Sequence, residues 1–160
     1  MKSTILFFAF VLVSGLTFGQ VNFSGSWALN EAKSNFGDSQ FRMASPKLAI
    51  TQDPSTFTIE RTFVNRDGEE RKMSEKYTLD GNESLNPMFN SQKKSVVTWS
   101  ADKKVMTVTS SMTLEFNGET TELKTVENYS LSGDGNAMTI DTQSTSSRGE
   151  RKYTAVYDKK

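Results

Sequence analysis

N-F-S-G-S-W-A-L-N, residues 22–30, decides how the rest of this 160-residue chain is interpreted. Alternate side chains of an extended strand point to opposite faces, so Phe23, Trp27 and Leu29 share one apolar face. Gly25 lies on the same face and has no side chain, which leaves room for a large ring two residues later. The stretch predicts the first strand of a barrel, with structural roles for Gly25 and for Trp27, which closes one end of the sheet.

The first twenty residues have the pattern of a signal peptide. Lys2 gives a positive start, Ile5–Val13 is an apolar run too short to cross a bilayer, and Thr17-Phe18-Gly19 offers small residues at a cleavage site. We therefore expect residues 1–20 to be removed and residues 21–160 to form one exported domain, periplasmic or secreted. An ordered N-terminal helix is the alternative. The short, lysine-poor leader and export without cysteine are typical of a bacterial protein.

Composition excludes several classes of function. The chain has 19 Lys and Arg against 19 Asp and Glu, spread without blocks, so it has no footprint for nucleic acid or anionic lipid. Without histidine or cysteine, Ser-His-Asp and Cys-His catalysis and histidine-bound zinc are excluded. We expect no cofactor, no metal ion, no catalytic residues and, since no second apolar run exists, no membrane span.

Hairpin parity indicates a meander of long strands with one apolar face. The apolar residues have odd numbers in both Thr56–Asn65 and Glu69–Leu79. Keeping them on one face of the hairpin requires a loop with an odd number of residues, and a three-residue loop that ends in Gly68 fits. The apolar residues have even numbers in Lys104–Phe116 and odd numbers in Glu119–Leu131. This change requires a loop with an even number of residues, and the two-residue turn Asn117-Gly118 fits. Turns at 132–135 and at Arg148-Gly149 also keep the apolar residues of successive strands on one face. Leu48–Thr51 is predicted to form an earlier strand.

Nine strands are clear, and a simple antiparallel meander closes only with an even number. We infer a short tenth strand in Ser84–Asn90, interrupted by Pro87, because closure removes the open edges of so long a sheet. The alternative is an eight-stranded barrel. After the first strand, Asn30 is expected to cap a helical turn that ends near Gly37, and the connection from there to Pro46 is a candidate lid.

Gly25-x-Trp27 on the first strand of an exported meander resembles the lipocalin signature. The mature chain resembles the wider calycin group, which includes the fatty-acid-binding proteins, through Phe23-x-Gly25-x-Trp27-x-Leu29 and a final strand that carries Arg151-x-Tyr153. The resemblance implies an all-β, closed up-and-down antiparallel barrel of 8–10 strands, with a short helical turn or lid. It also implies that Arg151 and Tyr153 grip a ligand carboxylate, as an Arg-x-Tyr pair does in fatty-acid-binding proteins.

Charge that interrupts an apolar face marks further candidates. Arg61 shares its face with Phe57 and is expected opposite Met73 and diagonal to Glu75. It is either an internal cation for an acidic head group or one half of an Arg-Glu pair, because buried charges are costly unless they are paired. Arg151 and Tyr153 either contact ligand or make a structural bond, such as an arginine over Trp27. Phe57 and Trp99 complete the candidate ligand-binding set, and Trp99 is equally interpretable as core.

Three functions remain. The first is an exported lipocalin-like protein that carries or sequesters a small hydrophobic or amphiphilic ligand in the barrel. The second is a structural or inhibitory barrel with a filled interior, whose loops act on an unknown protein partner. The third is an enzyme that uses cavity carboxylates. An interior cavity of a few hundred cubic ångströms favours the first over the second.

Overall fold

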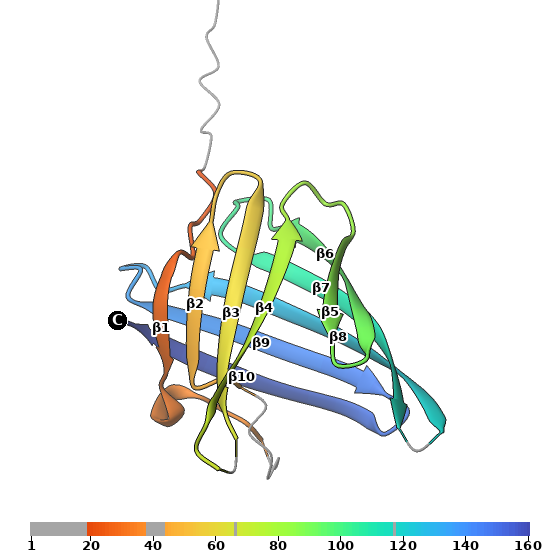
Figure 1. Ribbon diagram of the computed structural model, residues 1–160. Coiled ribbons are helices and arrows are strands. Elements are labelled where there is room, and N and C mark those ends of the chain that lie inside the picture. Colours follow the sequence, from red (N-terminus) through yellow and green to blue (C-terminus); the bar gives the residue numbers. More distant parts are fainter. Residues whose placement is uncertain (1–18, 38–43, 66, 117) are drawn as a thin grey trace, which may run out of the picture.

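The computed structural model describes residues 19–37, 44–65, 67–116 and 118–160, and these form ten strands and one short helix (Figure 1). The helix is the 3₁₀ turn η1 (Glu31–Lys33). The strands are β1 (Gly25–Leu29), β2 (Lys47–Gln52), β3 (Thr56–Val64), β4 (Glu70–Thr78), β5 (Ser84–Met88), β6 (Ser91–Trp99), β7 (Met106–Phe116), β8 (Glu119–Leu131), β9 (Ala137–Ser146) and β10 (Gly149–Lys159).

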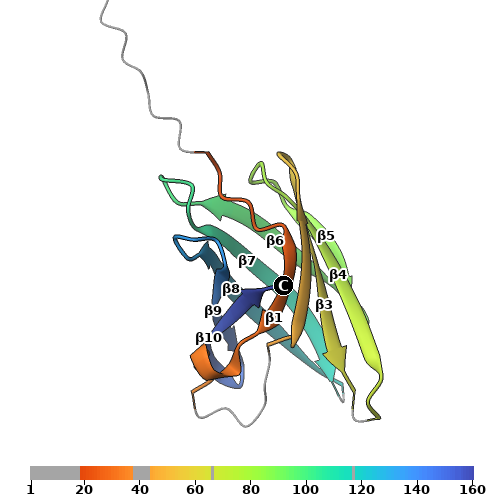
Figure 2. The ribbon, with the colours of Figure 1, turned by 90° about the vertical axis from the view of Figure 1, so that its left-hand side faces the viewer.

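Sequential strands pair antiparallel except β4 with β5, and β1 pairs with β10. The sheet therefore curls into a nearly closed barrel in the order β4-β3-β2-β1-β10-β9-β8-β7-β6-β5. Figure 2 shows β3 and β4 on one side of the barrel and β7 to β10 on the other. The predicted all-β up-and-down barrel with a short, Pro87-containing strand is confirmed. The eight-stranded alternative is wrong, because Ser84–Met88 pairs with β6 as a full member of the sheet.

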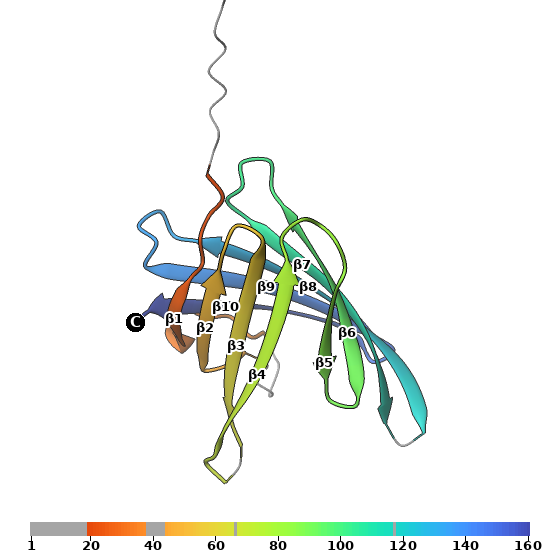
Figure 3. The same ribbon diagram turned by 45° about the horizontal axis from the view of Figure 1, so that its top comes forward.

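The last seam, between β4 and β5, is closed by side chains. Asn86 accepts the Lys76 N–H through Oδ1 at 2.8 Å and donates through Nδ2 to the Lys76 carbonyl at 3.0 Å. The Thr78 N–H donates to Ser84 Oγ at 2.9 Å. Figure 3 shows β4 and β5 next to each other at this seam. These polar side chains therefore satisfy backbone groups of β4 that a direct strand pairing would otherwise satisfy.

The predicted turns largely hold. The Asn65 N–H donates to the Glu69 carbonyl at 2.9 Å, and Gly68 has φ +83°, which confirms the three-residue loop. The β7–β8 register likewise leaves two residues between Phe116 and Glu119. The last turn lies one residue earlier than predicted, at 147–148, because Ser146 pairs with Gly149. The turn still has two residues, so the apolar residues of β9 and β10 stay on the same face of the sheet.

The turn after β1 is capped as predicted but is shorter. Asn30 Oδ1 accepts the Lys33 N–H at 3.1 Å. The turn ends at Ser34 instead of near Gly37, because Ser34 Oγ accepts the Val156 N–H and Asn35 bridges to β10. Most of the candidate lid, residues 38–43, lies outside the described residues, as do residues 1–18 of the expected signal peptide. Within the described ranges, no helix has the length and apolarity needed to cross a bilayer.

Aromatic rings fill one end of the barrel. Trp27 is 1% exposed and donates Nε1–H to the Phe23 carbonyl at 3.0 Å. Phe23 stacks on Trp99 at 6.2 Å between ring centroids and meets Phe57 edge-on at 6.2 Å. The chain before β1 crosses this end, since the Val21 N–H donates to the carbonyl of Lys103 in the β6–β7 loop. We call the end of the barrel that contains these rings the closed end.

Gly25 has the backbone role expected of it. Its φ of +145° favours glycine, and a Cβ built there meets Lys159 Cε at 3.1 Å and the Trp27 ring at 3.7 Å. Lys159 Nζ lies 5.4 Å from the centroid of the Trp27 ring. The cation over the first-strand tryptophan is therefore Lys159 and not Arg151.

Candidate ligand-binding cavity

The opposite end of the barrel contains a cavity of about 460 Å³, which we call the mouth cavity. Most of its wall comes from inner-face positions of β7 to β10 near their hairpins, and Phe89 of the β5–β6 turn faces it from another side. Its lining residues are Phe89, Leu114, Glu115, Thr121, Leu123, Ser144, Ser146, Arg148, Gly149 and Arg151.

The mouth cavity combines apolar and cationic groups. Leu114 and Leu123 are half-buried in its wall, whereas Phe89 is 77% exposed and has a φ of +54° that side chains rarely adopt. Arg148 and Arg151 are exposed and form no ion pair with the described residues. A small molecule with an apolar body and an anionic or acceptor end matches this wall.

A cluster of four charged side chains and one tyrosine lies deeper in the barrel, and we call it the charge cluster. Arg61 Nη2 donates to the two Glu127 carboxylate oxygens at 2.9 and 3.1 Å and to Tyr129 Oη at 2.8 Å. Arg61 Nε donates to Glu75 Oε2 at 3.4 Å, and Lys93 Nζ donates to Glu75 Oε1 at 2.7 Å. Two cations thus face two carboxylates.

Burial and pairing oppose each other in this cluster. Burial by itself would raise the pKa of Glu75, but Lys93 and Arg61 outweigh it and hold that pKa below the ordinary value of a glutamate. Burial also works against the charged form of Arg61, but Glu127, Tyr129 and Glu75 raise its pKa well above the ordinary value. Glu75 and Arg61 therefore stay charged at neutral pH, and the cluster pairs two basic side chains with two acidic ones.

Hydroxyl groups on neighbouring strands add to the polar side chains inside the barrel around the charge cluster. Ser95 Oγ and Ser110 Oγ hydrogen-bond to each other at 2.9 Å. Thr142 lies opposite Glu127 in the β8–β9 register, and Tyr77 follows Glu75 on the same face of β4. Tyr77 Oη and Thr142 Oγ1 are buried, and their hydrogen-bonding neighbours are the Glu75 carboxylate and the Tyr153 hydroxyl, respectively.

The structure separates the residues that the sequence analysis grouped. Phe57 is fully buried and Trp99 stacks on Phe23, so both belong to the closed end. The Arg61 side chain belongs to the charge cluster. On the backbone, Arg61 lies opposite Met73, as predicted. Arg151 lines the mouth cavity, but Tyr153, half-buried and 6.0 Å from the Phe36 ring, is not among its lining residues.

Sequence reasoning missed Lys93 and Glu127 in the cluster, and Phe89, Leu114 and Leu123 in the cavity wall. A usable signal was present for the first two. Lys93 shares its face with Ser95 and Val97, and Glu127 shares its face with Tyr129, so each interrupts an inner face as Arg61 does. The same criterion, applied to every strand, finds them.

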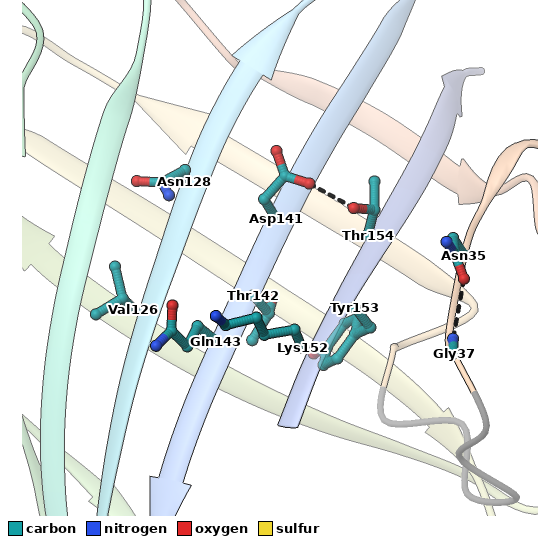
Figure 4. Close-up of a pocket in the computed structure, with 10 residues that line it drawn as sticks. All are labelled: Asn35, Gly37, Val126, Asn128, Asp141, Thr142, Gln143, Lys152, Tyr153 and Thr154. Carbon is teal, nitrogen blue, oxygen red and sulfur yellow. Dashed lines mark hydrogen bonds between the residues drawn. The ribbon is translucent and has the colours of Figure 1, made fainter. Parts of the chain in front are cut away.

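A second, shallower hollow of about 340 Å³ lies against the outer face of β8 to β10, shown in Figure 4. Asn128, Asp141 and Thr154 form one row on this face, and Thr154 donates to Asp141 at 2.5 Å. Val126 and Tyr153 also line the hollow, but most of its lining side chains are polar. No group of three potential metal ligands exists among the described residues. The mouth cavity is therefore the better candidate for a ligand.

No protein-family model matches the chain, and no curated protein matches it. Among solved structures, the fold is similar to that of a zebrafish ileal bile acid-binding protein, crystallised in complex with cholic acid. The TM-score is 0.53 at 15% sequence identity, over 86% of this chain and 98% of that chain. At this identity the likeness concerns the fold alone, and it confirms the predicted resemblance in architecture.

Proposed function

We propose that this chain is an exported, lipocalin-like binding protein that carries or sequesters a small, partly apolar ligand in the mouth cavity. The neighbour in fold is a binding protein, which supports a binding function over a catalytic one. The observation that carries the proposal is the mouth cavity itself. Its volume of about 460 Å³ lies within the ~300–1,000 Å³ of small-molecule pockets, and a few polar groups interrupt an apolar wall.

The orientation of the ligand follows from the two arginines. Arg61 has its charge balanced by Glu75 and Glu127, so it offers no net attraction to an anion. Arg151 lines the open part of the cavity, opposite Ser144 in the β9–β10 register. An anionic head group is therefore placed at Arg151, with its apolar part against Leu114 and Leu123.

Arg151→Met tests this orientation because it removes the charge and keeps much of the volume. We expect decanoate binding, measured by calorimetry, to weaken about 10–100-fold, the loss of one charge-assisted hydrogen bond. Lys152→Met is the matched control, since Lys152 is the next residue and faces the outer hollow. Equal decanoate affinity in wild type and Arg151→Met, or no decanoate binding by wild type at high micromolar concentration, would contradict the proposed site.

Export is part of the proposal and is tested by intact mass. Protein recovered from the periplasm or medium of its own host is expected to lack about the first 19 or 20 residues. A mature mass that still includes Met1 would overturn the proposed localisation.

The second candidate function is a structural or inhibitory barrel that acts on a protein partner. The closed end favours it, because Phe23, Trp27, Phe57 and Tyr129 are each at most 1% exposed and leave no room there. The two candidates differ at the mouth cavity. If Leu123→Arg, which fills that cavity with charge, leaves the biological activity of the protein intact, the second candidate is favoured.

A further inference from the structure

Two arginines of the mouth cavity have no acidic partner. Arg148 lies in the turn between β9 and β10, and Arg151 lies on the inner face of β10. Both line the cavity, and neither side chain forms a hydrogen bond or an ion pair with the described residues. The cations deeper in the barrel differ, since Arg61 and Lys93 each contact a carboxylate. The positive charge at the mouth cavity is therefore available to a bound anion.

The acidic residues near these arginines are engaged elsewhere or lie on a distant strand. Glu150 pairs with Lys152 at 2.8 Å on the outer face of β10, and Glu122 pairs with Lys124 at 3.4 Å on the outer face of β8. The carboxylate in the cavity lining is that of Glu115 on β7. Two strands separate β7 from β10 in the sheet, so three strand spacings of about 4.8 Å place them roughly 14 Å apart. An anion at β10 is thus remote from this carboxylate.

Two serine hydroxyls lie beside the arginines. Ser144 is opposite Arg151 in the β9–β10 register, Ser146 follows on the same face of β9, and both line the cavity. Ser146 Oγ accepts the Arg148 N–H at 3.2 Å, so its own proton remains free for donation. The Ser144 hydroxyl forms no hydrogen bond within the described part of the chain. Guanidinium and hydroxyl donors therefore line the same end of one cavity.

The number and charge of these donors favour a particular head group. A carboxylate has one negative charge and two oxygens, and a single guanidinium group occupies both oxygens when it binds them bidentately. A phosphate monoester carries about −1.5 to −2 charges at pH 7 and has three acceptor oxygens. It can accept from two guanidinium groups and a serine hydroxyl at the same time, and the planar fork of arginine matches its geometry. The two arginines together therefore suit a phosphate better than a carboxylate.

We infer that the ligand of the mouth cavity is an amphiphile with a phosphate monoester head, bound between Arg148 and Arg151, with its apolar part against Leu114 and Leu123. The inference rests on the proposed function and narrows its ligand class. It gives Arg148 a role that a carboxylate ligand does not require. Inorganic phosphate shares the chemistry of the head group but has no apolar part, so a comparison of the two separates these sources.

Calorimetry with undecanoate and decyl phosphate tests the head group, because the two probes have the same ten-carbon tail. We expect wild type to bind decyl phosphate about 10–100-fold more tightly than undecanoate, the range for one additional charge-assisted hydrogen bond. Inorganic phosphate is expected to bind at least about 100-fold more weakly than decyl phosphate, because it lacks the contacts with Leu114 and Leu123. Equal affinities for inorganic phosphate and decyl phosphate would overturn the amphiphilic ligand.

Arg148→Met assigns the preference to the second arginine. Arg148 is exposed in a turn, so the substitution leaves the barrel interior intact. It should weaken decyl phosphate binding about 10–100-fold and undecanoate binding by less, so that the preference shrinks. Lys152→Met is the matched control, since it removes the same unit of charge from the outer face of β10, and it should keep the preference.

The outcomes separate the inference from the proposed function. If wild type binds undecanoate but shows no preference for decyl phosphate, or if Arg148→Met retains the full preference, the phosphate head group is wrong and the proposed function stands. If wild type binds neither amphiphile at high micromolar concentration, both are wrong.

Discussion

Glu75→Gln is the substitution whose effect follows most directly from the structure. Glu75 is 2% exposed, and its carboxylate lies 2.7 Å from Lys93 Nζ and 3.4 Å from Arg61 Nε. The Lys93 side chain is itself only 10% exposed. The amide keeps the shape and removes the charge, so the cluster acquires one uncompensated positive charge in a site that water barely reaches.

The magnitude follows from that burial. Breaking a buried ion pair by removing one partner costs about 3–5 kcal/mol, because the remaining charge stays desolvated. For a domain of this size the cost corresponds to a fall in Tm of about 9–20 °C. Glu75→Gln/Lys93→Met removes both charges and restores neutrality, so we expect the double variant to be more stable than Glu75→Gln.

Urea denaturation followed by tryptophan fluorescence measures these differences. Glu60→Gln is the control, because Glu60 pairs with Lys72 at 2.8 Å on the exposed face of the same hairpin, where the pair contributes at most about 1 kcal/mol. The reasoning is refuted if Glu75→Gln lies within about 0.5 kcal/mol of wild type. It is also refuted if the double variant loses as much as the two single variants together, since the two charges would then not be coupled.

Two further predictions concern the closed end and high pH. Trp27→Ala removes a ring that is 1% exposed and is expected to cost about 3–5 kcal/mol in urea denaturation; a loss below about 0.5 kcal/mol would mean that the ring does not support the barrel. Gly25→Val should also destabilise, because φ is +145° and the new Cβ meets Lys159. Burial, with nearby carboxylates, raises the pKa values of Tyr77 and Tyr129 well above their ordinary value of 10. Stability should therefore be retained below about pH 10 and fall above it, since the unfolded chain releases these protons first. A urea midpoint that does not fall between pH 9 and 11.5 would contradict this assignment, and Tyr129→Phe should reduce the slope.

Local patterns were enough to predict much of the fold. Whether the apolar residues of a hairpin have odd or even numbers decides whether its loop has an odd or an even number of residues. This placed Gly68 in a three-residue loop, and with that loop Arg61 lies opposite Met73. A simple antiparallel meander closes only with an even number of strands, and from this a tenth strand in Ser84–Asn90 was inferred. Parity does not distinguish two loops of equal length, so the last turn was placed one residue late.

The site depended on contacts that parity does not contain. Arg61 on β3 and Glu127 on β8 are 66 residues apart and meet only across the closed barrel. The sequence alone therefore showed Arg61 with one carboxylate, and it left open whether the Arg61 charge is paired or available to a ligand. The seam at Asn86 is similar, because a side chain that replaces strand pairing leaves no periodic pattern.

Native mass spectrometry of the mature protein purified from its own host tests the central claim most directly. We predict the mass of one chain plus one small molecule, displaced when decanoate is added and absent from Leu123→Arg. A bare chain that takes up no decanoate at high micromolar concentration would contradict the proposal that the mouth cavity binds a ligand.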